Sequence, residues 1–181
     1  MSQILTYTRK MFDPLHPRQE LVDIEDISHA LSMLCRANGH VDTFYSVGQH
    51  SINCMREAAA RGLSERVQLA CLLHDASESY LSDVTRPVKA ELPRYRQIEE
   101  PLQELIWTKW LGAPLTEAER FQVFQIDDAI LAHEFLHLMG TEITDPIPEI
   151  RSVPEFAFTG FEICSREFLE LFRKLTEDTS L

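Results

Sequence analysis

The stretch VQLACLLHDASESY, residues 67–80, joins a helical apolar pattern to a cluster of polar side chains. Its inward positions repeat at intervals of three and four residues, as on one face of an α-helix: Val67, Ala70, Cys71 and His74. Asp75 then falls at the helix end, and Glu78 lies one turn beyond His74. Because imidazole and carboxylate together suit a mid-series divalent ion, the stretch predicts a metal site at the end of a buried helix.

Helical spacing recurs along most of the chain. Ser46 with Gln49 and Thr116 with Glu119 have the form of capping boxes, which mark helix starts. The helices are expected over residues 26–38, 46–62, 64–75, 94–111, 116–139 and 161–175. The pattern predicts an all-α helical bundle in which Arg36 falls in the last turn of the first long helix.

The remaining segments show no helical period. The first twenty or so residues are expected to form a short extended arm or hairpin. Residues 80–93 contain two prolines and are expected to form a loop with short turns, as is the acidic segment 145–154. Pro101 is expected to kink its helix or to begin a new first turn.

Composition limits the class of protein. A chain of 181 residues that is 44% hydrophobic is expected to form a single domain, residues 1–181. The net charge of -12 argues against binding to a nucleic acid polymer, which requires a basic face. The four cysteines lie far apart in apolar stretches, so reduced core thiols are expected. No leader-like start and no long apolar run are visible, which predicts a cytoplasmic protein with no membrane contact.

An isolated His-Asp pair is weak evidence for a metal, since most such pairs are a solvated carboxylate beside a satisfied histidine. Here His50 lies upstream and Asp127 downstream, so a set of two histidines and two aspartates can be assembled from three expected helices. Asp128 is the alternative to Asp127, because neighbours on a helix point about 100° apart and only one of them can face the site.

Three stretches carry a family resemblance: DIEDISHALSMLCRANGHVDTFYSVGQHS, LLHDASESYLSDVTRPVK and IDDAILAHE. They resemble the HD-domain phosphohydrolases, most closely the YfdR-like group, which is related to the bacterial 5'-deoxynucleotidase YfbR. They also resemble the phage-encoded dATP triphosphohydrolases of the same superfamily. The likeness spans most of residues 3–175 and implies a single HD domain.

The resemblance implies a role for each matching residue. The ligands of one divalent metal ion (cobalt, manganese, zinc, nickel, iron or magnesium) would be His50, His74, Asp75 and Asp127. Catalytic roles fall to Glu78, which would orient the attacking water or shuttle protons, and to Asp83, which would contact the sugar. The substrate phosphate would be held by Arg36 and Lys89, with Arg86 as a third candidate. The family also implies a homo-oligomer.

The implied substrate is a small-molecule nucleotide. We expect a deoxynucleoside monophosphate rather than a triphosphate, because few basic residues are placed to neutralise three phosphates. Family members have a tryptophan after the arginine, where it can pack on the base, whereas Ala37 follows Arg36 here. The resemblance therefore does not extend to the contact with the base.

Two other interpretations stay open. Residues 133–137, HEFLH, match the H-E-x-x-H motif of zinc peptidases, although helix-surface histidines are the ordinary interpretation of such a match. A peptidase would also need an edge strand and a third ligand, neither of which the sequence indicates. The other alternative is a non-catalytic nucleotide-binding HD protein.

Overall fold

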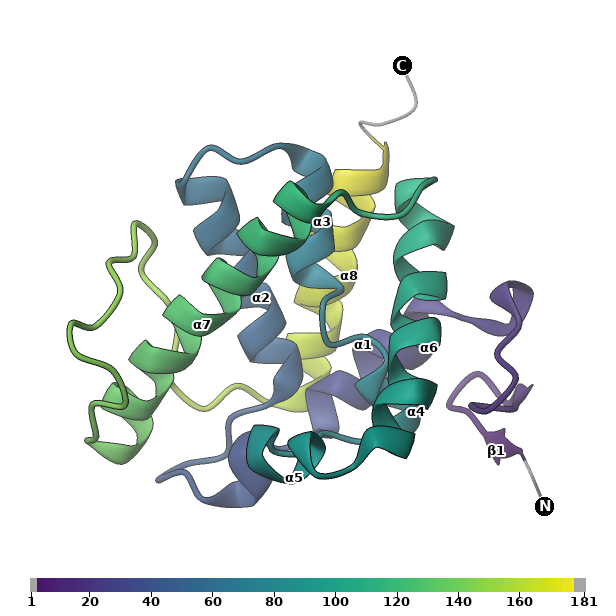
Figure 1. The fold of residues 1–181 in the computed structure, drawn as a ribbon, viewed down its shortest axis with the longest axis horizontal. Coiled ribbons are helices and arrows are strands. Elements are labelled where there is room, and N and C mark those ends of the chain that lie inside the picture. The colour runs from purple at the N-terminus through teal and green to yellow at the C-terminus, as the bar shows by residue number, and fades with distance from the viewer. Residues whose placement is uncertain (1–2, 178–181) are drawn as a thin grey trace.

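The chain folds as a set of packed helices with a small N-terminal hairpin (Figure 1). This computed structural model describes residues 3–177. The hairpin pairs β1 (Ile4–Leu5) with β2 (Met11–Phe12) in antiparallel register. The α-helices are α1 (Ile24–Met33), α2 (Val47–Ala60), α3 (Glu65–Leu72), α4 (Glu78–Leu81), α5 (Arg86–Ala90), α6 (Pro93–Leu111), α7 (Glu117–Met139) and α8 (Phe161–Glu177). The predicted all-α class with a short extended N-terminal arm is confirmed.

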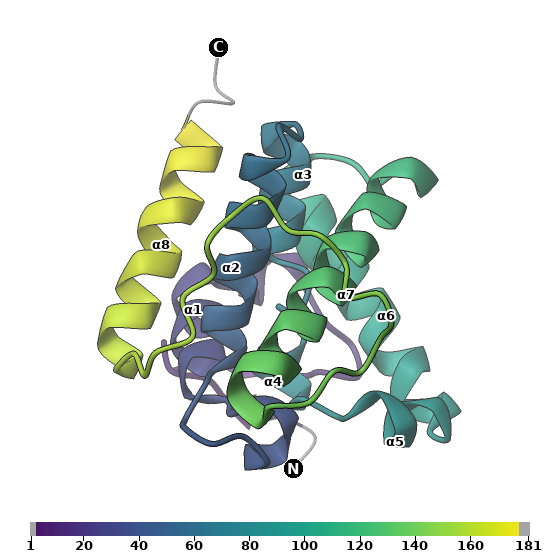
Figure 2. The same ribbon diagram turned by 90° about the vertical axis from the view of Figure 1, so that its left-hand side faces the viewer.

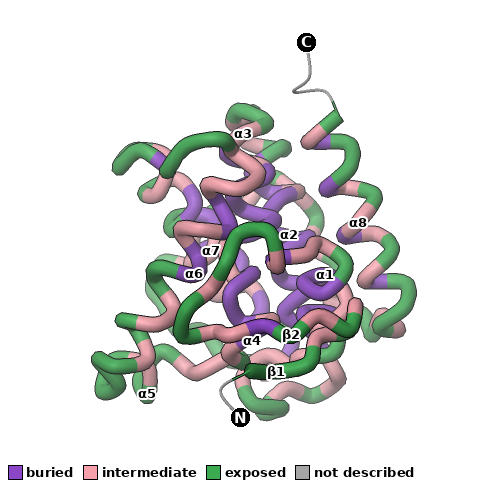
Figure 3. Tube along the Cα trace, turned by 90° about the vertical axis from the view of Figure 1, so that its right-hand side faces the viewer, coloured by how far each residue is buried: buried purple, intermediate pink, exposed green. Residues whose placement is uncertain are grey.

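Helix α2 is the centre of the packing. It contacts α1, α3, α7 and α8, and nearly all of its residues are buried (Figure 3). Gly48 permits the closest of these approaches, because a Cβ atom there would lie 2.9 Å from Cys164 Sγ and 3.2 Å from the Ser32 backbone nitrogen. The first turn of α2, which carries His50, is therefore held against α1 and α8.

Local capping explains why the predicted helix starts are correct. The Ser46 hydroxyl accepts from the Gln49 backbone N–H and the Gln49 side chain accepts from the Ser46 backbone, so the α2 capping box is present. Thr116 and Glu119 form the second box at the start of α7. Gly140 ends α7 in the left-handed conformation, which glycine adopts without steric cost.

The first long helix is shorter than predicted, so the expectation that Arg36 lies in its last turn is wrong. α1 ends at Met33, and the chain turns extended at Leu34 and Cys35. The reason is a long-range pairing: Val47 donates to the Leu34 carbonyl at 2.9 Å, and Arg36 donates to the Tyr45 carbonyl at 2.9 Å. Arg36 instead begins a 3-10 turn, Arg36–Gly39, in which Ala37 has a φ of 51°.

Two other segments are more helical than predicted. The segment expected to be a loop contains α5, with Pro87 in its first turn, where a missing N–H costs nothing. Helix α6 runs through Pro101 as one element. Over residues 3–177, no helix is long and apolar enough to cross a lipid bilayer.

Residues 141–160 form an irregular segment, here called the strap, which crosses α2 and α7 (Figure 2). It is held by one polar stripe of α2, Gln49, Asn53 and Glu57. Gln49 Nε2 donates to the Ala157 carbonyl at 3.0 Å. The Asn53 amide donates to the Glu155 carbonyl at 3.0 Å and accepts from the Glu155 backbone N–H at 3.1 Å. The Glu57 carboxylate accepts from Arg151 N (3.0 Å), Ser152 N (2.7 Å) and Ser152 Oγ (2.7 Å). The strap is thus attached by buried side chains rather than by a strand ladder.

Candidate metal centre

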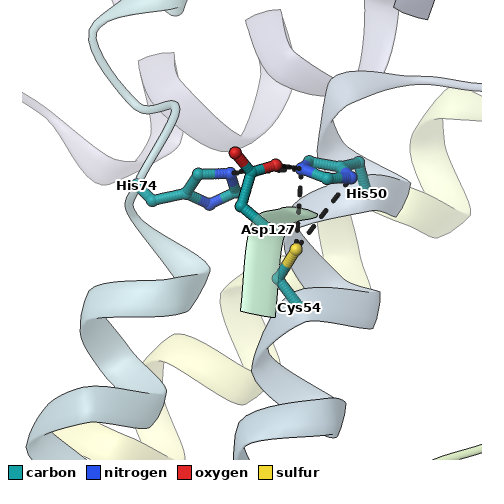
Figure 4. Close-up of side chains that lie close together, drawn as sticks. All are labelled: His50, Cys54, His74 and Asp127. Atoms are coloured by element: carbon teal, nitrogen blue, oxygen red, sulfur yellow. Dashed lines mark hydrogen bonds and ion pairs between the residues drawn. The ribbon is translucent and has the colours of Figure 1, made fainter. Parts of the chain in front are cut away.

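Side chains from three helical regions meet at one point inside the bundle (Figure 4). His50 lies in the first turn of α2, His74 follows the end of α3, and Asp127 lies midway along α7. His50 Nε2 is 3.1 Å from His74 Nε2 and 3.1 Å from Asp127 Oδ1. Asp75 Oδ2 is 3.2 Å from His74 Nε2 and 3.8 Å from His50 Nε2. The structure therefore brings together all four side chains that the resemblance implies as ligands.

The Nδ1 atom of each imidazole has a hydrogen-bond partner, and this partner determines where the Nε2 atom points. His50 Nδ1 lies 2.6 Å from Glu134 Oε1, and His74 Nδ1 lies 2.7 Å from the Cys71 carbonyl oxygen. Since both partners are acceptors, each Nδ1 carries the proton, and each Nε2 lone pair points into the cluster. This arrangement is typical of histidines that bind a metal.

The chemistry of the donor set fits a divalent cation. Two imidazole lone pairs and two carboxylates face one another at 3.1–3.8 Å, which is unfavourable unless a positive charge lies among them. Burial opposes protonation, yet Asp75 and Asp127 raise the pKa of His74 well above its ordinary value. Two imidazoles and two carboxylates accept several first-row metals.

Cys54 also lies against the cluster. Its sulfur is 3.5 Å from His50 Nε2, and one ligand atom each from Cys54, His50, His74 and Asp127 can be chosen within 4.8 Å of one another. Burial and the nearby carboxylates raise the pKa of the Cys54 thiol well above its ordinary value. The charge of His74 lowers the pKa of Asp75 even though burial acts in the other direction. His50, His74 and Asp127 are thus accompanied by two further potential donors, Cys54 and Asp75, and Cys54 was not predicted from the sequence.

A cavity of about 580 Å³ opens onto this cluster of side chains. Asp75 and Asp127 reach it from the cluster, together with five predicted site residues: Arg36, Glu78, Asp83, Arg86 and Lys89. One wall is apolar and comes mostly from α7 and the start of the strap: Phe124, Leu131, Phe135, Leu138, Met139 and Ile143. The cavity thus has a charged end beside the candidate metal centre and an apolar wall along α7.

Glu78, one of the two predicted catalytic carboxylates, lies beside Lys89 in the lining of the cavity. It is 4% exposed, its Oε2 has no hydrogen-bond partner among the residues that the structure describes, and its Oε1 lies 3.5 Å from Lys89 Nζ. Burial, Asp75 and Asp83 raise the pKa of Glu78 well above its ordinary value. Burial likewise raises the pKa of Asp83. Glu78 thus combines a buried carboxyl oxygen that lacks a partner among residues 3–177 with a place in the lining of the cavity.

The cationic side chains differ in how firmly they are held. Arg36 lies between two carboxylates, with Nη2 3.1 Å from Glu134 Oε2 and Nη1 3.5 Å from Asp75 Oδ2. Lys89 Nζ lies 2.6 Å from Glu99 Oε1. These contacts fix both cations at the charged end of the cavity.

Arg86 is the most exposed of the three cations and bridges the neighbouring aspartates of α7. It donates to Asp127 Oδ2 at 2.6 Å and to Asp128 Oδ1 at 2.5 Å. Only Asp127 also approaches the histidines, and Asp128 turns toward Arg86 at the surface. The geometry favours Asp127 over Asp128 as the ligand, as the motif indicated.

The H-E-x-x-H segment of α7 is split between two surroundings. His133 Nε2 lies 2.9 Å from the Pro148 carbonyl oxygen of the strap, and His137 Nδ1 lies 2.9 Å from the His133 carbonyl oxygen. Glu134 turns the other way, toward His50 and Arg36. Within residues 3–177, the histidines of this motif belong to no cluster of potential ligands, so the peptidase interpretation finds no support.

Comparison with known proteins gives partial matches. No family model matches the chain. Uncharacterized protein YfdR of Escherichia coli is 35% identical over 114 residues, which is 63% of this chain and 61% of that protein. Uncharacterized protein RCAP_rcc00048 of Rhodobacter capsulatus is 37% identical over 120 residues, which is 60% of this chain and 61% of that protein. The match thus covers about three fifths of each relative's length, and the chain is a distant homologue of YfdR.

Proposed function

We propose that this protein is an HD-domain, metal-dependent phosphohydrolase that acts on deoxynucleotides, and that residues 1–181 form one such domain. The observation that carries the proposal is the meeting of His50, His74, Asp75 and Asp127 at the charged end of a cavity. Those four residues were selected from the sequence for their chemistry and for the family they resemble. Their distances suit one shared cation.

Each residue at the charged end has a part in hydrolysis. His50, His74, Asp75 and Asp127 would hold a divalent ion, which would supply Lewis acidity toward a phosphoryl oxygen and lower the pKa of a water molecule. Glu78 accepts the proton of the attacking water through its unpartnered Oε2. Arg36 donates to phosphate oxygens from a fixed position, and Lys89 supplies a second positive charge.

The charge balance favours a substrate with one phosphate. Three cationic and five carboxylate side chains line the cavity, so a divalent ion brings their formal charge to neutrality. A monophosphate dianion then adds negative charge to which Arg36 can donate hydrogen bonds. A triphosphate adds about twice that negative charge, and the cavity lining offers no additional cationic side chain to balance it. We therefore propose a 5'-nucleotidase that releases phosphate from deoxynucleoside monophosphates, with a dATPase-like triphosphohydrolase as the alternative.

The test is a turnover screen of purified protein against deoxynucleoside mono- and triphosphates with cobalt, manganese, zinc, nickel, iron and magnesium. Release of inorganic phosphate from monophosphates, lost in His74→Ala and Asp75→Ala, is the expected result. Release of triphosphate would favour the alternative. Binding of nucleotides without turnover in every metal would favour the non-catalytic nucleotide binder.

We also propose that the protein is a homo-oligomer, as the family resemblance implies. Large exposed apolar side chains lie on the hairpin, α1 and α8: Leu5, Tyr7, Met33, Phe161 and Ile163. Sedimentation equilibrium across a range of concentrations tests this proposal. A constant monomer mass would contradict it.

A further inference from the structure

Glu134 is a buried carboxylate with two different partners, one on each oxygen. Oε1 lies 2.6 Å from His50 Nδ1, and Oε2 accepts from Arg36 Nη2 at 3.1 Å. The residue is 4% exposed and sits two turns after Asp127 on α7. One side chain thus touches a candidate metal ligand and a candidate phosphate-binding residue.

The contact with His50 determines which nitrogen of that ring faces the cluster. Because Glu134 accepts the Nδ1 proton, Nε2 keeps its lone pair and points toward His74 and Asp127. The contact with Arg36 matters in a different way. Arg36 lies outside any long helix, in a turn that contains the left-handed Ala37, so its guanidinium depends on side-chain contacts for its orientation.

We infer that Glu134 is a positioning residue that couples the metal centre to the phosphate site, by orienting His50 through Oε1 and Arg36 through Oε2. The metal half of this inference is independent of turnover, and the phosphate half rests on the proposed function. Glu134 does not contact the reacting atoms. Its effect passes through the two residues that it holds.

Glu134→Gln is the informative substitution, because an amide has one acceptor oxygen for two donors. Either His50 or Arg36 then faces an NH₂ group, and the charge that holds Arg36 is lost. Substitutions of a residue that orients a metal ligand typically weaken metal affinity roughly 10- to 100-fold. We expect a loss in that range for Glu134→Gln in a titration with manganese or cobalt, together with weaker binding of inorganic phosphate to the metal-loaded protein.

Three further variants separate this role from general destabilisation. Glu57→Gln alters another buried glutamate, one that holds the strap, and should leave metal affinity unchanged. Arg36→Ala removes one partner of Glu134 and keeps the contact with His50, so it should weaken phosphate binding by a larger factor than it changes metal affinity. Glu134→Asp, whose shorter side chain keeps the charge, should restore part of the metal affinity.

Metal affinity of folded Glu134→Gln within threefold of the unmodified protein would overturn the inference and leave the proposed function standing. An unmodified protein that binds no divalent metal would overturn both. If Glu134→Gln does not fold, nitrogen NMR of the unmodified, metal-loaded protein decides: His50 must carry its proton on Nδ1 and the metal on Nε2, and the reverse would overturn the inference.

Discussion

Replacing Asp127 by asparagine should abolish most of the stabilisation that a divalent metal gives to the fold. Asp127 Oδ1 lies 3.1 Å from His50 Nε2 and 3.7 Å from His74 Nε2, so its carboxylate faces the point where the cation would bind. Asp128 is the matched control, because it lies next to Asp127 on α7 but bonds Arg86 instead of the histidines. The two substitutions make the same chemical change on the same helix.

The expected size follows from binding linkage. Free metal at 100 times its dissociation constant stabilises the native state by about 2.7 kcal/mol. For a domain of this size each kcal/mol raises Tm by roughly 2–4 °C, so the metal should raise Tm by about 5–11 °C. Loss of a direct ligand weakens binding by at least roughly 100-fold, which leaves about 0.4 kcal/mol at the same metal concentration, or about 1–2 °C.

The assay is thermal unfolding followed by circular dichroism, for each protein with metal and after exhaustive chelation. Comparing each variant with itself cancels any change that the substitution causes in the metal-free fold. Asp128→Asn should keep the full metal-dependent shift in Tm. An equal shift in both variants would refute the assignment of Asp127 as a ligand.

Three further outcomes are expected. Glu57→Ala should lower the free energy of unfolding by about 3 kcal/mol at neutral pH, since it removes a buried carboxylate that accepts hydrogen bonds from Arg151 and Ser152. Burial acts against ionisation of Glu57, but hydrogen bonds from the strap lower its pKa below 4.5. The difference in the free energy of unfolding between Glu57→Ala and the unmodified protein, measured by denaturant titration, should therefore become smaller as the pH falls below about 4.5. Cys54→Ser should weaken cobalt or zinc binding relative to manganese, because sulfur favours softer metals, and calorimetry with each metal would contradict this if the order stayed the same. A His133→Ala, His137→Ala double variant should keep its bound zinc by mass spectrometry of the native protein, whereas His74→Ala should lose it; the opposite pattern would restore the peptidase interpretation.

Local signals made most of the fold predictable. Capping boxes at Ser46 and Thr116 involve residues three positions apart, so the sequence alone indicates where α2 and α7 begin. The end of α1 was predicted wrongly because a pairing between Leu34 and Val47 stops it, and such a pairing cannot be found from helical spacing. Long-range pairing outweighs local helix propensity at this point.

The candidate site likewise contains residues that sequence signals indicate and a contact that depends on long-range packing. His74 and Asp75 are adjacent in sequence, and the family motif supplied His50 and Asp127, whose roles as ligands remain predictions. The contact of Glu134 with His50 was missed, although its spacing of seven from Asp127 puts both on one face of α7. Its partner lies 84 residues away, so only the packing of α7 on α2 could reveal it.

The residue of the strap that lines the cavity is different from the residues that attach the strap to α2. Ile143 of the strap lines the cavity, while the strap is fastened to α2 at Gln49, Asn53 and Glu57. These three side chains hold the strap at residues 151–157, and Ile143 lies outside that part of the strap. The part of the strap that lines the cavity can therefore change in sequence without loss of the contacts that attach the strap to α2.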